Sequence, residues 1–142
     1  MFITRASRRD RDELREFYES QDWGVAHVEE GVAYFAREGA ITGAIRLAEA
    51  EPNVLMVDDV VVREDKRGQG IGKALVQAAM NSRGGKLFLV CHPPVRSFYE
   101  AFGFTEVDYE LLPQSIKDYV ERDGDAPHQL EEGHEHVFMT AR

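Results

Sequence analysis

The stretch from Val54 to Arg83 decides the fold of this chain: VLMVDDVVVREDKRGQGIGKALVQAAMNSR. Val54–Val62 is mostly apolar and β-branched, which predicts a strand buried in a sheet. The charged residues 63–66 predict a loop that faces solvent. A glycine-rich turn follows, and beyond it apolar residues recur at helical spacing, at Ile71, Ala74, Leu75, Ala78 and Ala79. The glycines at positions 84 and 85 predict the end of this helix.

The turn, Arg67-Gly68-Gln69-Gly70-Ile71-Gly72, is suited to binding an anion. A helix N-terminus carries unpaired N–H groups and a partial positive charge, and glycines let a phosphate come close to them. The turn fails the P-loop pattern, because Arg67 replaces the first glycine and Ala74 replaces the final Ser or Thr. Its evenly spaced glycines also fail the dinucleotide fingerprint. A third pattern, R-x-x-G-x-G, is met by Arg67, Gly70 and Gly72.

With this motif the chain resembles the GNAT acetyltransferase superfamily, in which R-x-x-G-x-G binds the pyrophosphate of acetyl-CoA. A second element agrees, since Ser97–Phe104, SFYEAFGF, is similar to the family's FYxxxGF element. Taken alone, the first motif could also be a strand–helix connection in which the glycines serve only a tight turn and bind no phosphate. The resemblance implies acetyl-CoA as co-substrate, bound by Val60, Val62, Arg67, Gly68, Gln69, Gly70, Ile71, Gly72, Lys73 and Phe98.

The rest of the pattern predicts strands and helices on both sides of this stretch. Further strands are expected at Phe2–Arg5, Gly31–Arg37, Ala40–Ala48, Leu87–His92 and His136–Thr140, and another strand should begin at Phe104. Further helices are expected from Ser7 to about Ser20, at Val95–Phe102, and from Pro113 to before Gly124. The strand–helix–strand crossover predicts parallel fourth and fifth strands. We therefore predict an α+β, GNAT-like fold in one domain, residues 1–142. Helices would flank a central, mostly antiparallel mixed sheet of about seven strands, with the parallel pair splayed.

Composition limits the class of protein. The chain has 142 residues, 43% apolar and 30% charged, which is typical of a soluble globular domain. No apolar run approaches the ~20 residues that span a bilayer, and the first ten residues lack a signal-peptide apolar region. The only cysteine, Cys91, excludes an internal disulfide and fits a cytoplasmic location. A net charge of −9 argues against nucleic acid as a partner, and the sequence leaves both a monomer and a homodimer open.

The family's thioester chemistry assigns roles to residues on two segments. In the family, pantetheine pairs with backbone amides of the splayed fourth strand, where Val60 and Val62 are expected. The Val60 N–H could stabilise the oxyanion that forms when an amine attacks the thioester. Tyr99, in the second motif, would protonate the departing CoA thiolate. A phenol of pKa ~10 is close enough to a thiol for that exchange.

The general base is the least determined part of the mechanism. Family members often use a glutamate on the fourth strand, and the corresponding position, near Met56, cannot accept a proton. Asp58 shares a face with Met56 in a regular strand, whereas Asp59 points the other way unless a bulge intervenes. Both aspartates could instead be caps or water-bridged structural groups. His92 is a further candidate, and the amine could also lose its proton to water.

We expect an N-acetyltransferase that moves an acetyl group to a primary amine of a small molecule or amino acid. The alternatives are a non-catalytic acyl-CoA-binding sensor or interaction module, and a protein-lysine or N-terminal acetyltransferase. Leu112-Pro113 begins a segment weakly similar to N-acetylglutamate synthases, which leaves the acceptor open. His134-Glu135-His136, if in a strand, places two histidines on one face without a third ligand, so we expect no metal site.

Overall fold

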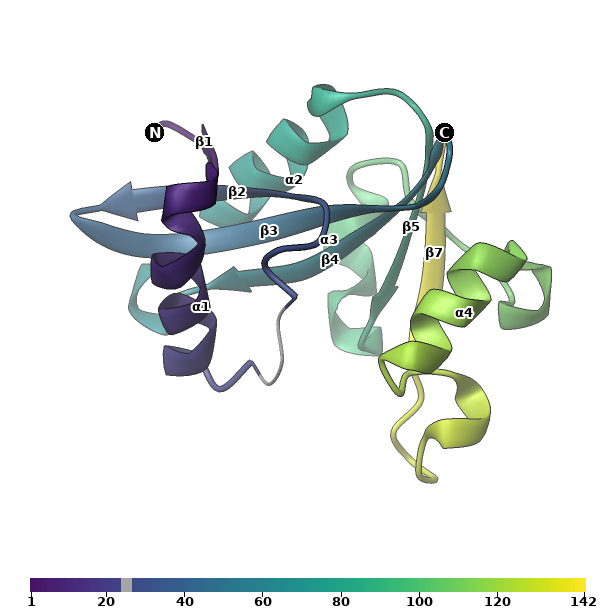
Figure 1. Ribbon diagram of the computed structural model, residues 1–142. Helices are drawn as coiled ribbons and strands as arrows, with labels where there is room; N and C mark the ends of the chain where they lie inside the picture. The colour runs from purple at the N-terminus through teal and green to yellow at the C-terminus, as the bar shows by residue number, and fades with distance from the viewer. Residues whose placement is uncertain (24–26) are drawn as a thin grey trace. The chain divides into compact units, whose positions relative to one another are not determined.

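The strands of the protein form a mixed sheet. A computed structural model describes residues 1–23 and 27–142. In this part of the chain the strands are β1 (Thr4–Arg5), β2 (Val32–Glu38), β3 (Ala40–Glu51), β4 (Val54–Val62), β5 (Lys86–Cys91), β6 (Thr105–Glu106) and β7 (Val137–Ala141). The α-helices are α1 (Arg11–Ser20), α2 (Ile71–Ser82), α3 (Arg96–Glu100) and α4 (Gln114–Arg122). The seven strands are ordered β1-β2-β3-β4-β5-β7-β6 (Figure 1), which confirms the predicted α+β fold.

The chain divides into two compact units. Unit 1 contains Met1–Ala48 and Val57–Gly84, and unit 2 contains Glu49–Met56 and Gly85–Arg142. Strands β3 and β4 contribute residues to both units. That the whole chain behaves as one domain remains a prediction.

Unit 1 is built on the antiparallel hairpin of β2 and β3, with a helix on each face (Figure 1). The two strands meet at Gly39, whose φ of +72° favours glycine. Helix α1 buries Leu14, Phe17 and Tyr18, as predicted, in a cluster with β2 and β3 side chains. On the other face a Cβ at Gly43 would lie 2.8 Å from the Ile71 side chain, so this glycine allows α2 to approach β3 closely.

Two elements of unit 1 differ from the sequence prediction. The helix expected from Ser7 begins as a 3₁₀ turn at Arg8–Asp10, and α1 follows it. The predicted capping contact is present, because the Ser7 amide donates to the Asp10 carboxylate at 2.7 Å and lowers the pKa of Asp10. Strand β3 extends beyond Ala48 to Glu51, and eight consecutive residues of it are buried, including the polar Thr42 and Arg46.

Unit 2 is built on β5, which pairs with β4 on one side and β7 on the other. The parallel pairing with β4 covers Val54–Met56 opposite Lys86–Phe88, as the crossover predicted. Strand β7 is antiparallel to both β5 and β6. Helices α3 and α4 lie on opposite sides of β5 and β7 (Figure 1). Helix α3 is shorter than the expected Val95–Phe102, because Pro93–Val95 forms a 3₁₀ turn and the α-helix ends at Glu100.

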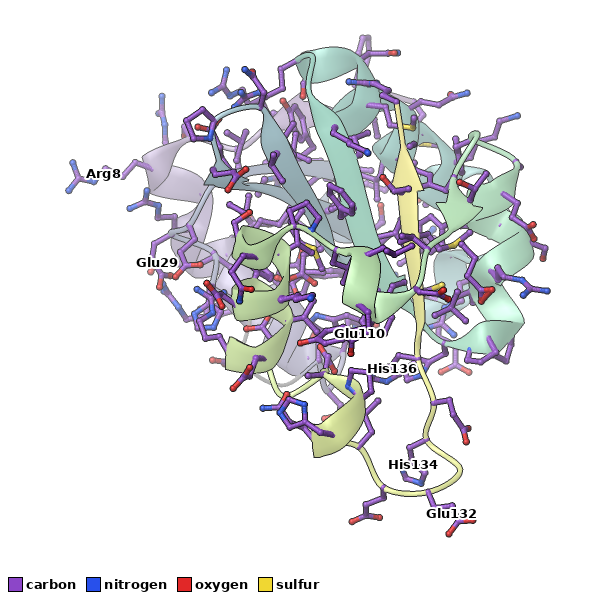
Figure 2. All side chains as sticks on the ribbon, turned by 90° about the vertical axis from the view of Figure 1, so that its right-hand side faces the viewer. Arg8, Glu29, Glu110, Glu132, His134 and His136 are labelled. Atoms are coloured by element: carbon purple, nitrogen blue, oxygen red, sulfur yellow. The ribbon has the colours of Figure 1, made fainter. Side chains whose placement is uncertain are left out.

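The histidine pair before β7 does not have the expected strand geometry. Strand β7 begins at Val137, one residue after His136. His134 and Glu132 both lie in the loop that precedes β7 (Figure 2). Within residues 1–23 and 27–142, no three potential metal ligands come together. In the same ranges no helix is long and apolar enough to cross a bilayer.

Candidate active site

The glycine turn presents an open backbone at the start of α2. Gly68 and Gly70 have φ of +80° and +83°, and a Cβ built at either position meets no atom within 4 Å. The first helical hydrogen bond runs from the Ala74 amide to the Gly70 carbonyl, so the amides of residues 71–73 precede the helical ladder. This arrangement offers an anion a positively polarised backbone at the start of α2.

Charged side chains hold the loop that leads into this turn. Arg63 forms two hydrogen bonds to Asp65, at 2.7 and 2.6 Å. Lys66 pairs with Glu38 of the hairpin at 2.6 Å. Arg67, the motif arginine, is exposed, and its Nε donates to the Val62 carbonyl at 3.2 Å. The turn is therefore tied to the end of β4, where Val60 and Val62 occupy half-buried positions around the buried Val61.

Strand β4 departs from regular alternation at Asp59. Its φ of +53° lies in the left-handed region, which costs a non-glycine residue about 1–2 kcal/mol. Met56 and Val57 are both buried, and so is the Asp59 side chain, at 8% exposure, while Asp58 is 24% exposed. The strand is thus irregular at Asp59. For this reason the faces on which Asp58 and Asp59 lie cannot be counted from Met56 as in a regular strand.

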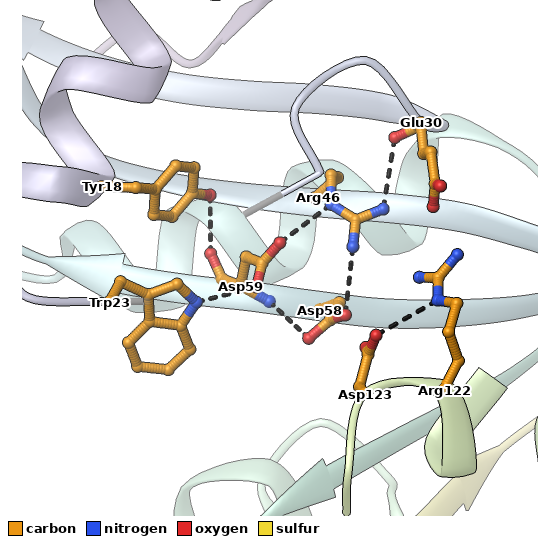
Figure 3. Close-up of polar contacts among 8 residues, drawn as sticks. All are labelled: Tyr18, Trp23, Glu30, Arg46, Asp58, Asp59, Arg122 and Asp123. Atoms are coloured by element: carbon orange, nitrogen blue, oxygen red, sulfur yellow. Dashed lines mark hydrogen bonds and ion pairs between the residues drawn. The ribbon is translucent and has the colours of Figure 1, made fainter. Parts of the chain in front are cut away.

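The two aspartates are held by Arg46 of β3, whose side chain is 1% exposed (Figure 3). Its Nε donates to the Asp59 carboxylate at 2.9 Å, and one terminal nitrogen donates to Asp58 at 3.1 Å. The other terminal nitrogen donates to the Glu30 carbonyl at 3.2 Å. A buried guanidinium requires such pairing, because removal of a charge from water is unfavourable unless partners compensate for it.

Asp59 has two further partners from the first fifth of the chain (Figure 3). The Trp23 indole N–H donates to its carboxylate at 2.7 Å, and the Tyr18 hydroxyl donates to its carbonyl oxygen at 2.7 Å. The Asp59 amide donates in turn to the Asp58 carboxylate at 2.9 Å. Burial, and then the negative charge of Asp59, raises the pKa of Tyr18 well above its ordinary value. Tyr18 is therefore a neutral hydroxyl donor across the physiological pH range.

Tyr99 and Phe98, the residues of the second motif, lie in α3 of unit 2. Tyr99 is 8% exposed and Phe98 is 37% exposed. The Tyr99 ring makes edge contacts with Phe98 at 5.0 Å and with Phe104 at 6.0 Å between ring centroids. Gly103, with φ of +94°, ends the segment as the motif predicted. The aromatic contacts fix the ring, which favours a defined position for its hydroxyl.

His92, the third candidate base, follows β5 and contacts a second histidine. Its ring lies 4.9 Å from that of His136, centroid to centroid. His136 Nδ1 is 3.5 Å from the Asp125 carboxylate. Burial raises the pKa of Asp125, and the neighbouring His136 opposes that shift. These three groups form a small titratable cluster within unit 2.

Sequence reasoning missed Arg46 and the polar role of Tyr18. Tyr18 was predicted only as a core residue of α1, and the strand containing Arg46 was described by its apolar face. The available signal was a charged residue inside an otherwise apolar strand. Such a residue needs an acidic partner when buried, and two adjacent aspartates lie on the next strand.

Solved structures have the same fold. Rv2747 from Mycobacterium tuberculosis, in complex with CoA, aligns at a TM-score of 0.67 and 16% identity, over 99% of this chain and 98% of that chain. A GNAT-family acetyltransferase from Staphylococcus aureus Mu50 aligns at a TM-score of 0.68 and 17% identity, over 98% of this chain and 96% of that chain. N-acetylglutamate synthase from Neisseria gonorrhoeae, complexed with coenzyme A and N-acetyl-glutamate, aligns at a TM-score of 0.67 and 18% identity. The alignment covers 100% of this chain but 35% of that chain.

Sequence comparison assigns the family. No curated protein matches the chain. The family model described as acetyltransferase (GNAT) domain matches residues 28–106, which is more than half of the chain. That range contains β2 to β6, the glycine turn and both aspartates. The chain therefore belongs to the GNAT acetyltransferase family.

Proposed function

We propose that the protein is an N-acetyltransferase that moves the acetyl group of acetyl-CoA to a primary amine of a small molecule or amino acid. The observation that carries this proposal is the open glycine turn at the N-terminus of α2. Residues 67–73 would hold the pyrophosphate through backbone N–H groups and Arg67. CoA in the Mycobacterium and Neisseria structures, and the family itself, support acetyl-CoA as the co-substrate.

The proposed reaction is a direct attack on the thioester. The neutral amine nitrogen bonds to the carbonyl carbon, and the carbonyl oxygen takes an electron pair that the Val60 N–H stabilises. The carbon–sulfur bond then breaks and Tyr99 protonates the CoA thiolate. The amine gives its proton to a carboxylate, and solvent returns a proton to Tyr99. The role of Tyr99 rests on the family motif and on the acidity of a phenol.

Asp58 is the better candidate for the base. Asp59 accepts hydrogen bonds on both carboxylate oxygens, from Trp23 and Arg46, and is nearly inaccessible. Asp58 is bound by Arg46 and the Asp59 amide but exposes about a quarter of its side chain. A partly exposed carboxylate can accept a proton from an acceptor amine without disruption of the buried core. Asp59 and His92 remain the second and third candidates.

Thiol release tests the proposal. The protein is mixed with acetyl-CoA and a panel of amines, and free CoA thiol is followed against enzyme-free controls. Turnover with a small amine or amino acid is the expected result. Mass spectrometry of a cell extract treated with labelled acetyl-CoA then identifies the acceptor, and label on proteins alone would favour a protein acetyltransferase. Acetyl-CoA binding without transfer to any acceptor would favour the sensor or interaction module.

We also propose a cytoplasmic location. The single cysteine, Cys91, is buried and forms no internal disulfide, which suits a reducing compartment. Fractionation of cells that produce the tagged chain tests this location. Enrichment in the membrane or secreted fraction would contradict it.

A further inference from the structure

The peptide bond between Asp59 and Val60 is held from one side by Tyr18. The Tyr18 hydroxyl donates to the Asp59 carbonyl at 2.7 Å, and both groups are buried. In a trans peptide the carbonyl of one residue and the N–H of the next lie in one plane and point in opposite directions. A donor that fixes the Asp59 carbonyl therefore also fixes the direction of the Val60 N–H.

The rest of Asp59 is held as firmly. Its carboxylate accepts from Arg46 and Trp23, and its amide donates to Asp58. These contacts keep Asp59 at φ +53°, a conformation that a non-glycine residue adopts only when its surroundings impose it. Without them the strand would relax toward regular alternation, and the Val60 N–H would turn to another direction.

We propose that Tyr18 and Arg46 are positioning residues for the oxyanion donor, acting through Asp59 on the Val60 N–H. The Tyr18 hydroxyl also polarises the peptide, because a hydrogen bond to a carbonyl strengthens the N–H on the same amide as a donor. This inference rests on the proposed function, in which that N–H stabilises the oxyanion. It adds two buried residues that would act on the oxyanion through Asp59.

The first experiment removes only the hydroxyl. Tyr18→Phe keeps the buried ring, and Tyr34→Phe in β2 is the matched control outside this network. We expect Tyr18→Phe to lower kcat about 10- to 100-fold, below the 10²–10³ that complete loss of an oxyanion donor costs. The Kd for acetyl-CoA should change less than kcat, since Val60 is one of several groups expected to bind acetyl-CoA whereas the oxyanion forms only in the transition state. In ¹⁵N NMR the Val60 amide should shift less on addition of acetyl-CoA than in wild type.

A second experiment separates backbone conformation from charge. Arg46→Met/Asp59→Gly and Arg46→Met/Asp59→Ala both remove the buried ion pair and differ by one methyl group. Glycine accepts a positive φ and alanine does not. We therefore expect the glycine variant to retain about tenfold more turnover than the alanine variant, and a Val60 amide signal nearer to wild type. A merely structural role predicts equal turnover, or less turnover for glycine, because glycine weakens strands.

The outcomes distinguish this inference from the proposed function. If wild type binds acetyl-CoA and transfers acetyl groups, an unchanged Val60 shift and kcat in Tyr18→Phe overturn the inference alone. If wild type binds acetyl-CoA without turnover, the proposed function fails. In that case the inference is tested by the Val60 amide alone. The change in its NMR signal on addition of acetyl-CoA is compared with the change on addition of CoA, and a difference that is the same in wild type and Tyr18→Phe overturns the inference. If wild type does not bind acetyl-CoA, both are overturned.

Discussion

At the scale of single residues, Tyr99 is the group whose role is tested by the smallest change. Tyr99→Phe removes one oxygen and leaves the ring contacts with Phe98 and Phe104. We expect kcat to fall about 10- to 1000-fold, the size of a single acid–base contribution or slightly below it. Acetyl-CoA affinity should change little, and the loss should be smaller with an acyl donor whose thiol is more acidic. Tyr119→Phe, at another buried tyrosine of unit 2, is the control. Normal kcat in Tyr99→Phe would remove the general-acid role.

The two aspartates should differ in their response to pH. Asp58→Asn should lower kcat/KM most near neutral pH and recover part of it at higher pH, where more of the amine is already neutral. Asp59→Asn should lose activity to a similar degree at every pH, because we propose that Asp59 positions the backbone of β4. Full pH profiles of both variants measure this difference. If neither profile changes, His92→Gln becomes the next variant to measure.

Cys91 should make stability depend on alkaline pH. Burial raises the pKa of this thiol from 9.0 to about 11, so the folded chain keeps it neutral when the unfolded chain ionises it. The stabilisation is complete below pH 9 and is lost as the pH rises toward 11. Two pKa units correspond to about 2–3 kcal/mol of unfolding free energy. Urea unfolding at pH 8 and pH 11 should show this loss in wild type relative to Cys91→Ala. Equal losses in both proteins would mean that other groups titrate instead.

At the scale of elements, the glycine turn is tested by two valines in equivalent backbone positions. Gly70 and Gly39 both have positive φ and open space around a Cβ, so valine strains both turns equally. Wild type and Gly39→Val should both gain melting temperature with acetyl-CoA, since a ligand of the native state stabilises it. Gly70→Val should lose that gain, and Arg67→Glu should lose most of it by placing an anion beside phosphates. A full gain in Gly70→Val and Arg67→Glu would locate the pyrophosphate elsewhere.

The elements differ in how far sequence predicts them. The strand, turn and helix around Arg67 follow from β-branched residues, glycine spacing and helical periodicity, all of which act locally. The parallel pairing of β4 and β5 follows from the crossover rule. The left-handed backbone at Asp59 does not follow from local sequence, because partners as distant as Tyr18 and Arg46 impose it. The sequence therefore predicts the two aspartates as candidates, but not the hydrogen bonds that hold them.

At the scale of the whole molecule, we expect one cooperative unfolding transition. Strands β3 and β4 each supply residues to both units, so neither unit has a complete set of strands without them. Trp23, the only tryptophan, lies in unit 1 and reports on it by fluorescence, whereas far-UV circular dichroism reports on all helices and strands. The two signals should change at the same urea concentration. Separate midpoints would show that the units unfold independently and that the chain is not one domain.

The buried pair of Arg46 and Asp59 also bears on the history of the sequence. Loss of Arg46 leaves the buried Asp59 carboxylate without this cation, and loss of Asp59 removes one of the two carboxylates paired with the buried Arg46. Breaking a buried ion pair commonly costs about 3–5 kcal/mol and would unfold a marginally stable protein. A lineage that loses this pair must therefore change both residues together, or first gain stability from substitutions at other positions. Descendants of a common ancestor should carry arginine and aspartate together at these two positions, or neither of them.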